Sequence, residues 1–264
     1  MGNVAVTGQD DADPAQIDAL YRDPQTYELL AQMTAPADLP FYRALLGDAA
    51  GRVLELGCGT GRLSLPLARH ATEMTGLDNA PAMLDFARQR AAAAGSTAHF
   101  VRADFCRFDL GMHFDWILLP YNALNHITDD AGLDGLFESV ASHLAPGGRF
   151  VVDSFQPDPA ALARPWERRR LLTYLDPSLN QRITLSESSR YDAARRVNHI
   201  TWHYDLGDQS DWRIHRTSMR ILFADELDTL FRDHGFIIGS KYGHYDRSPF
   251  GPRSPKQLMV AKLA

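Results

Sequence analysis

The stretch Glu55-Leu56-Gly57-Cys58-Gly59-Thr60-Gly61 decides the fold of this chain of 264 residues. This stretch overlaps the end of the apolar run RVLELG at 52–57 and continues into glycines. An apolar run that ends in glycines is typical of a buried parallel strand before a tight turn. Helical spacing follows in GRLSLPLARH at 61–70, with Pro66 near the first turn. Glycines between a strand and a helix let the backbone approach a ligand closely, and the N–H groups at the helix start attract polar or anionic groups.

Strands and helices continue to alternate after this loop. The expected strands are MTGLD at 74–78, HFVR at 99–102, FDWILLP at 114–120 and RFVVDSF at 149–155, with helices over 81–94 and about 129–144. A helix at 224–235 and two strands, FIIGSKY at 236–242 and QLMVAKL at 257–263, complete the pattern. Such alternation predicts right-handed βαβ units around a parallel sheet that helices cover on both faces. The predicted fold class is therefore α/β and doubly wound.

Residues 156–222 break this alternation. They contain short segments rich in Thr, Ile, Tyr and Trp, separated by turn sequences such as DPSLN and LGDQSD, and these predict an antiparallel meander. We expect residues 1–50 to form an N-terminal helical cap and residues 51–155 with 223–264 to form the core. The remaining β-insert, 156–222, would serve as a lid, a substrate wall or a dimer contact.

The net charge of −6 is unevenly distributed along the chain. The insert has eleven arginines and no lysine against eight acidic residues, a net charge of +3, so the rest of the chain carries −9. The acidic total disfavours nucleic acid and an anionic membrane as partners. We therefore expect a small molecule as the ligand, and we expect the chain to be a monomer or a homodimer.

Two further features favour a cytoplasmic location. No apolar run approaches the roughly 18 residues of a membrane helix, and the start, MGNVAVTGQDDADPAQ, lacks the basic and apolar regions of a secretory signal. Cys58 and Cys106 are too few for a disulfide framework or a four-ligand zinc site. We expect no bound metal.

Acidic residues follow two strands that neighbour the glycine loop in sequence. Asp78 ends the second expected strand, where a carboxylate can accept both hydroxyls of a ribose, and Asp104 follows the third, with Phe105 beside it to cover an adenine ring. A dinucleotide fingerprint would need glycine at position 62, which is Arg62. The pattern therefore favours an adenosine-containing ligand other than a nicotinamide dinucleotide.

These residues resemble the class I S-adenosylmethionine-dependent methyltransferases. The matching elements are VLELGCGTGRLSLPLA at 53–68, GLDNAPAMLDFAR at 76–88, RADF at 102–105, FDWILLPYNALNHI at 114–127 and LAPGGRFVVDSF at 144–155. The resemblance implies a seven-stranded, mostly parallel Rossmann-like sheet with S-adenosylmethionine as cofactor. The tyrosines near the N-terminus, the β-insert and the ending GHYDRSPFGPRSPKQLMVAKL look more narrowly like small-molecule tailoring enzymes that methylate amines, including deoxysugar and peptide N-methyltransferases.

The resemblance also implies roles for individual residues. Gly57, Gly59 and Gly61 would line the methionine part of the cofactor, Asp78 the ribose, Asp104 and Phe105 the adenine, and Pro120 the sulfonium end. The side chains of Glu55, Cys58, Asn79 and Met83 are expected to complete this site, without a nucleophilic role for Cys58. Tyr27 and Tyr21 match tyrosines that close over the cofactor in the relatives, or else they simply pack on an amphipathic helix.

Methyl transfer from a sulfonium needs a nucleophile held in line with the methyl group, and a general base where the nucleophile carries a proton. The candidates follow the fourth strand. His126 is the candidate base, and Tyr121 and Asn122 are candidates for orienting an amine or a hydroxyl. The alternative for His126 is a surface or capping role.

Three residues are candidates for contact with the acceptor: His203 and Arg220 in the insert and Tyr245 before the last strand. The sequence leaves the acceptor open. Nitrogen is favoured over oxygen or carbon, with a peptide N-terminus as a further acceptor. A protein that binds S-adenosylmethionine without catalysis is the alternative of another class, and the intact glycines and Asp78 argue against it.

Overall fold

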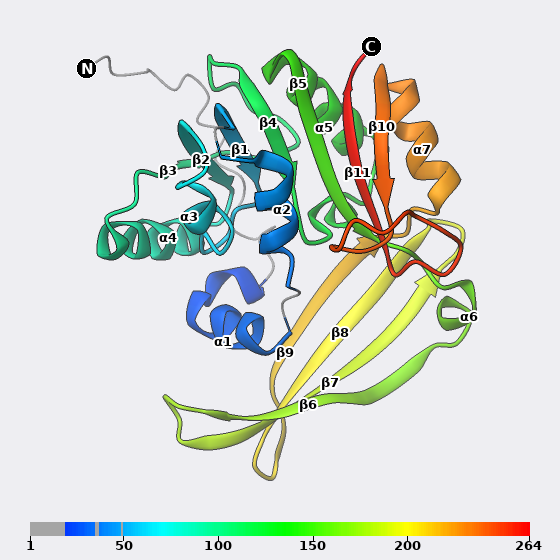
Figure 1. The fold of residues 1–264 in the computed structure, drawn as a ribbon. Helices are drawn as coiled ribbons and strands as arrows, with labels where there is room; N and C mark the ends of the chain where they lie inside the picture. The colour runs from blue at the N-terminus through cyan, green and yellow to red at the C-terminus, as the bar shows by residue number, and fades with distance from the viewer. Residues whose placement is uncertain (1–18, 35–36, 49) are drawn as a thin grey trace. The chain divides into compact units, whose positions relative to one another are not determined.

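The computed structural model describes residues 19–34, 37–48 and 50–264, which divide into two compact units (Figure 1). The first contains the described residues up to Gln156 together with Phe223–Ala264, and the second is Pro157–Leu222. The helices expected before residue 50 belong to the first unit, and the parts of that expectation at 1–18, 35–36 and 49 lie outside the described residues.

The first unit is built on a seven-stranded sheet with the order β10-β11-β5-β4-β1-β2-β3. Its strands are β1 (Arg52–Leu56), β2 (Glu73–Asp78), β3 (His99–Arg102), β4 (Phe114–Leu119), β5 (Leu144–Phe155), β10 (Phe236–Tyr242) and β11 (Lys256–Leu263). The first five are parallel to one another, whereas β11 is antiparallel to both β5 and β10. The sequence prediction of a doubly wound, mostly parallel sheet is confirmed.

The strand order reverses between β1 and β4, because β2 and β3 continue the sheet on one side and β5 on the other. Such a switch point opens a crevice beyond the carboxyl ends of the strands, and ligands of open α/β sheets bind there. The glycine loop follows β1 directly, so the fold places it at this position.

Helices cover both faces of the sheet. The unit contains η2 (Ala19–Arg22), α1 (Pro24–Thr34), α2 (Leu39–Leu46), α3 (Ser64–Leu67), α4 (Pro81–Ala94), η3 (Ala123–His126), α5 (Asp130–His143) and α7 (Ala224–Asp233). On one face, Phe41 and Tyr42 of α2 are buried against Val151 of β5. On the other, Phe137 of α5 packs edge-on against Phe150 of β5, which points to the opposite side of the strand from Val151. Each fully buried side chain of this size stabilises the fold by about 1.5–3 kcal/mol.

Two element boundaries differ from the sequence prediction. The helix expected at 61–70 is a single turn, Ser64–Leu67, because Pro66 has no N–H to donate to the preceding turn. The strand expected at 149–155 begins at Leu144, which pairs with Phe114, and the Pro146-Gly147-Gly148 segment lies within the strand beside a register shift. Gly147 has φ +78°, so this bulge suits a glycine.

The second unit is the antiparallel meander that the turn pattern predicts. After the short helix α6 (Pro159–Leu162), it consists of β6 (Trp166–Asp176), β7 (Gln181–Asp192), β8 (Val197–Leu206) and β9 (Gln209–Arg220). Each strand pairs with the next in chain order. In the described part of the chain, no helix has the length and apolar character needed to cross a membrane.

Candidate active site

The glycine loop adopts a backbone that favours glycine at all three predicted positions. The φ angles of Gly57, Gly59 and Gly61 are +68°, +53° and +74°. A Cβ atom on Gly61 would lie 3.1 Å from the ring of Phe100, whereas no described atom lies within 4 Å of the corresponding position on Gly59. The loop is therefore packed against the protein at Gly61 and open at Gly59.

Asp78 lies at the end of β2 and is tied to this loop. Its Oδ2 accepts a hydrogen bond from the N–H of Gly59 at 2.7 Å, and its Oδ1 accepts one from the N–H of Ala80 at 2.8 Å. Burial raises the pKa of Asp78, and these backbone hydrogen bonds oppose the shift. A carboxylate has about four lone-pair sites, so both oxygens retain capacity to accept from ribose hydroxyls.

Asn79 and Met83 continue the chain beyond Asp78. Met83 is buried together with Ala80 at the start of α4, and Tyr21 and Tyr27 pack against this pair. The two tyrosine rings are 6.0 Å apart, and burial raises the pKa of Tyr27 well above its ordinary value. Both predicted tyrosines therefore lie over the end of β2 and the start of α4.

Asp104 and Phe105 follow β3. The ring of Phe105 would be 3.8 Å from a Cβ on Gly57, so it lies beside the glycine loop. Asp104 is exposed, and its Oδ1 accepts from the N–H of Cys106 at 2.8 Å. Their contacts with an adenine remain a prediction.

Glu55 and Cys58 lie beneath the loop. Glu55 is buried and accepts a hydrogen bond from the hydroxyl of Ser64, and burial raises its pKa to about 8. Cys58 is buried with its Sγ against Gly76 of β2, and burial raises the pKa of its thiol. Both side chains support the loop from the protein interior, and their contribution to cofactor binding remains a prediction.

Polar side chains before β1 form hydrogen bonds with the glycine loop and its neighbours, and the sequence did not predict these contacts. Glu28 accepts hydrogen bonds from the Thr60 hydroxyl and, at 2.9 Å, from Arg90. Arg62 binds the buried Asp38 through two hydrogen bonds of 2.7 Å. The only signal in the sequence was Arg62 itself, a charged residue where a dinucleotide fingerprint has glycine.

The turn after β4 carries the predicted catalytic residues. Pro120 is buried, and Tyr121 and Asn122 have φ angles of +54° and +62°. His126 ends the short helix η3, and its Nε2 is 3.2 Å from the hydroxyl of Tyr21. The structure therefore brings the candidate base into hydrogen-bond contact with one of the predicted cofactor-covering tyrosines.

A buried carboxylate beside this turn was also missed. Asp153 of β5 is fully buried; it accepts hydrogen bonds from the Tyr245 hydroxyl at 2.6 Å and from Lys256 Nζ at 2.9 Å. Lys256 also donates to the side chain of Asn122 at 3.1 Å. The sequence offered a weak signal, a single acid within the apolar run RFVVDSF, but its partner in β11 depends on strand pairing.

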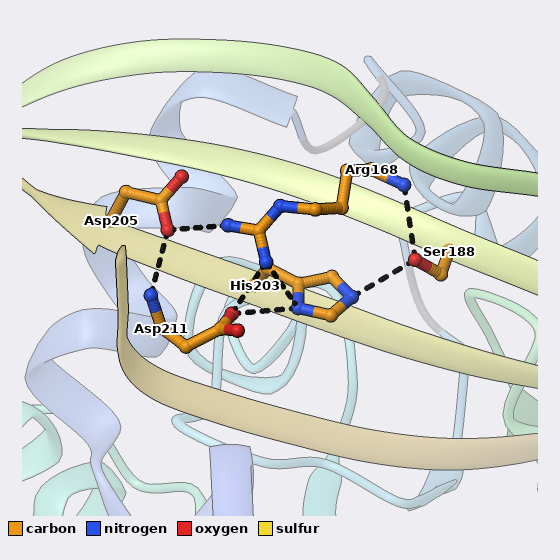
Figure 2. A network of polar contacts seen from close by, with 5 residues as sticks. All are labelled: Arg168, Ser188, His203, Asp205 and Asp211. Carbon is orange, nitrogen blue, oxygen red and sulfur yellow. Dashed lines mark hydrogen bonds and ion pairs between the residues drawn. The ribbon is translucent and has the colours of Figure 1, made fainter. Parts of the chain in front are cut away.

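The two remaining candidates lie in the second unit. His203 has partners at both ring nitrogens, Asp211 at 2.8 Å and Ser188 at 2.9 Å (Figure 2). Arg168 joins the same network by ion pairs of 2.8 Å with Asp211 and Asp205. Arg220 is the last residue of β9. Contact of His203 or Arg220 with an acceptor remains a prediction.

Comparisons with known proteins identify the central segment. Residues 53–148 match the family model described as a methyltransferase domain. The demethylmenaquinone methyltransferase of Thermus thermophilus is 37% identical over 142 residues, which cover 50% of this chain and 62% of that protein. The chain thus spans less than two thirds of that relative.

Two other proteins are similar over most of the chain. The cypemycin N-terminal methyltransferase of a Streptomyces species is 29% identical over 238 residues, covering 89% of this chain and 94% of that protein. The solved structure of the CcbJ methyltransferase from Streptomyces caelestis has a TM-score of 0.77 at 24% identity, covering 93% of this chain and 98% of that chain. This structural likeness shows a shared fold.

The residues at the switch point fit S-adenosylmethionine. The backbone is open at Gly59, the half-buried carboxylate of Asp78 suits ribose hydroxyls, and the ring of Phe105 lies beside the loop. Among the described residues, no three His, Cys, Asp or Glu side chains cluster as metal ligands. Residues 53–148 therefore match a methyltransferase domain, and the residues at its switch point would hold S-adenosylmethionine.

Proposed function

We propose that this chain methylates an amine nitrogen of a small-molecule or peptide acceptor. The observation that carries the proposal is the hydrogen bond of 3.2 Å between the Tyr21 hydroxyl and His126 Nε2, next to the turn after β4. This hydrogen bond joins an imidazole, a group that can accept a proton in catalysis, to a hydroxyl that fixes the orientation of the imidazole ring. The similarity to the cypemycin N-terminal methyltransferase over 89% of the chain supports an amine acceptor.

Different residues of the chain bind the cofactor, orient the acceptor and accept the proton. S-adenosylmethionine, when bound, supplies an electrophilic methyl group on a sulfonium centre. Gly57 to Gly61 and Asp78 hold the cofactor, while Tyr121 and Asn122 orient the acceptor nitrogen in line with the methyl group. Orientation of this kind lowers the barrier by about 7–11 kcal/mol.

His126 serves as the general base for an amine that loses a proton. The imidazole would take up the proton that the acceptor nitrogen loses when it gains the methyl group supplied by the bound cofactor. Such assistance contributes about 10²–10⁴-fold in rate. Tyr21 keeps the imidazole ring in place through the hydrogen bond to Nε2.

The test has two arms. Calorimetric titration of the purified chain with S-adenosylhomocysteine should show binding, and parallel titration with NADH should show none. The chain is then incubated with S-adenosylmethionine labelled in its methyl group and a panel of acceptors: a peptide with an unblocked N-terminus, an amino sugar, a phenol and an RNA oligonucleotide.

Label is expected in the peptide or the amino sugar and not in the phenol or the RNA. Transfer to the phenol alone would mean that the chain methylates oxygen and not nitrogen. Transfer to the RNA would mean that its acceptor is a nucleic acid and not a small molecule or a peptide. Absence of S-adenosylhomocysteine binding at high micromolar concentration would contradict the assignment of the cofactor site itself.

A further inference from the structure

The turn after β4 has an unusual backbone for its sequence. Tyr121 and Asn122 are consecutive residues with side chains, and both have positive φ angles, +54° and +62°. This left-handed region is unfavourable for residues other than glycine, and runs of two are held only where the surroundings determine them. Something in the fold must therefore stabilise the turn.

Asp153 supplies that stabilisation from the neighbouring strand. Its main-chain oxygen accepts from the N–H of Asn122 at 2.9 Å, and its Oδ2 accepts from the N–H of Tyr121 at 3.1 Å. One residue of β5 thus satisfies the backbone donors of both left-handed residues. The Asp153 side chain has no exposed surface, so water does not compete for these hydrogen bonds.

Lys256 and Tyr245 hold the Asp153 carboxylate in turn. Lys256 Nζ lies 2.9 Å from Asp153 Oδ1 and 3.1 Å from the side-chain oxygen of Asn122, so it joins the carboxylate to the turn. The Tyr245 hydroxyl donates to Asp153 Oδ2 at 2.6 Å. The carboxylate therefore has a cationic partner and two neutral donors, which a buried charge requires.

We infer that Asp153 and Lys256 are positioning residues for methyl transfer, which lock the left-handed turn of Tyr121 and Asn122 beside the bound cofactor. Neither residue touches the reacting atoms in this assignment. They act through the turn, whose displacement by about 1 Å costs on the order of 10²-fold in rate. The inference rests on the proposed function for its effect on methyl transfer, but not for its effect on the turn.

The substitution Asp153→Asn tests the inference. The side-chain amide of the introduced asparagine has one acceptor oxygen and one NH₂ group. The NH₂ group must therefore face another donor, either the Lys256 ammonium or the N–H of Tyr121. We expect hydrogen–deuterium exchange in the segment 117–128 to become at least 10-fold faster. The affinity for S-adenosylhomocysteine, measured by calorimetry, should stay within 3-fold of the parent.

Tyr245→Phe is the milder companion, because it removes one hydroxyl and keeps the ring that packs against Phe41. It should speed exchange in the same segment by about 3-fold. The matched control is Asp228→Asn, which removes a carboxylate paired with Lys241 at 2.5 Å in the same unit, away from the turn. Exchange at 117–128 should not change in the control.

Methyl transfer to the amine that the acceptor panel identifies gives the second readout. Asp153→Asn should lower kcat by at least 30-fold with the KM for S-adenosylmethionine within 3-fold. Unchanged exchange at 117–128 in both Asp153→Asn and Tyr245→Phe overturns the inference, and so does faster exchange with an unchanged kcat. The exchange arm needs no acceptor, so its failure is distinguishable from failure of the proposed function.

Discussion

Three acids close to the glycine loop and the turn after β4 have different partners and therefore different predicted roles. Asp78 is bound by the main-chain N–H groups of Gly59 in the loop and of Ala80. Glu55 is bound by the hydroxyl of Ser64, and Asp153 by Lys256 and Tyr245. Of the three, only Asp78 accepts a hydrogen bond from a main-chain N–H of the glycine loop. The substitutions below separate these roles residue by residue.

Replacement of Asp78 by Ala should weaken S-adenosylhomocysteine binding by about 10- to 100-fold, because hydrogen bonds to a charged acceptor are worth about 1.5–3 kcal/mol each. Calorimetric titration measures the change. Asp85→Ala is the matched control, since Asp85 is an exposed acid in α4 paired only with Arg88 among the described contacts. Equal affinities of Asp78→Ala and the parent would remove Asp78 from the ribose site.

Replacement of Glu55 by Gln should change how stability depends on pH. The folded-state pKa of Glu55 is raised from 4.5 to about 8, so the folded chain retains a proton that the unfolded chain releases. The free energy of unfolding of the parent therefore falls as pH rises from about 4.5 to 8, by at most about 1.4 kcal/mol per pH unit from this group.

Glutamine does not titrate, so the stability of Glu55→Gln relative to the parent should rise across this window and level off above about pH 8. Urea unfolding at pH 5, 6.5 and 8 measures the difference between the two proteins. A constant difference across these three pH values would mean that Glu55 titrates at its ordinary pKa in the folded state.

Replacement of His126 by Ala should lower the rate of methyl transfer by about 10²-fold or more, since a general base contributes about 10²–10⁴-fold. The acidic limb of the pH–rate profile should be absent in His126→Ala, because the variant lacks the base whose protonation would produce that limb. Tyr21→Phe keeps the ring packing and loses only the hydroxyl, so it should retain that limb with a smaller loss of rate. Superimposable profiles of His126→Ala and the parent would exclude His126 as the base.

At the scale of elements, the strand–turn–helix from β1 to α3 combines strained backbone with an open surface. Its glycines are all in the left-handed region, but their surroundings differ: Gly61 is packed against Phe100, and Gly59 is open. The C-terminal glycine of α4, Gly95, has φ +58° and no described atom within 4 Å of its Cβ position. Gly95 therefore has the same left-handed backbone conformation as Gly59 and equally open surroundings, but it lies outside the glycine loop.

Gly59→Ala and Gly95→Ala should each destabilise the protein by about 1–2 kcal/mol, the cost of a left-handed residue with a side chain. Only Gly59→Ala should also weaken S-adenosylhomocysteine binding, because its methyl group enters the open space at the loop. Thermal unfolding and calorimetric titration of the two variants separate these effects. Equal affinities would show that the cofactor does not approach Gly59.

At the scale of the whole molecule, the two units differ in architecture and charge. The first has the parallel sheet and the residues that fit the cofactor, and the second is a four-stranded antiparallel sheet whose residues give it a positive charge. We propose that the second unit selects the acceptor. Fold alone does not identify an acceptor, because one fold supports many substrates.

Arg220→Ala should therefore raise the KM for the acceptor by about 10-fold, as expected for loss of one hydrogen bond to a charged group. The affinity for S-adenosylhomocysteine should stay within 2-fold. Arg195→Ala, at the exposed turn between β7 and β8, is the control in the same unit. An unchanged acceptor KM in Arg220→Ala would remove this residue from the acceptor site.

The sequence by itself determined the α/β fold, the glycine loop and Asp78, because strand alternation and glycine position are local patterns. It predicted Pro81–Ala94 as a helix, but extended the helix after the loop and shortened β5, where Pro66 and the bulge at Gly147 alter the local pattern. Only the tertiary structure decided which polar groups meet. Asp153 and Lys256 are 103 positions apart and come together because β11 pairs antiparallel with β5, a pairing that no local pattern encodes.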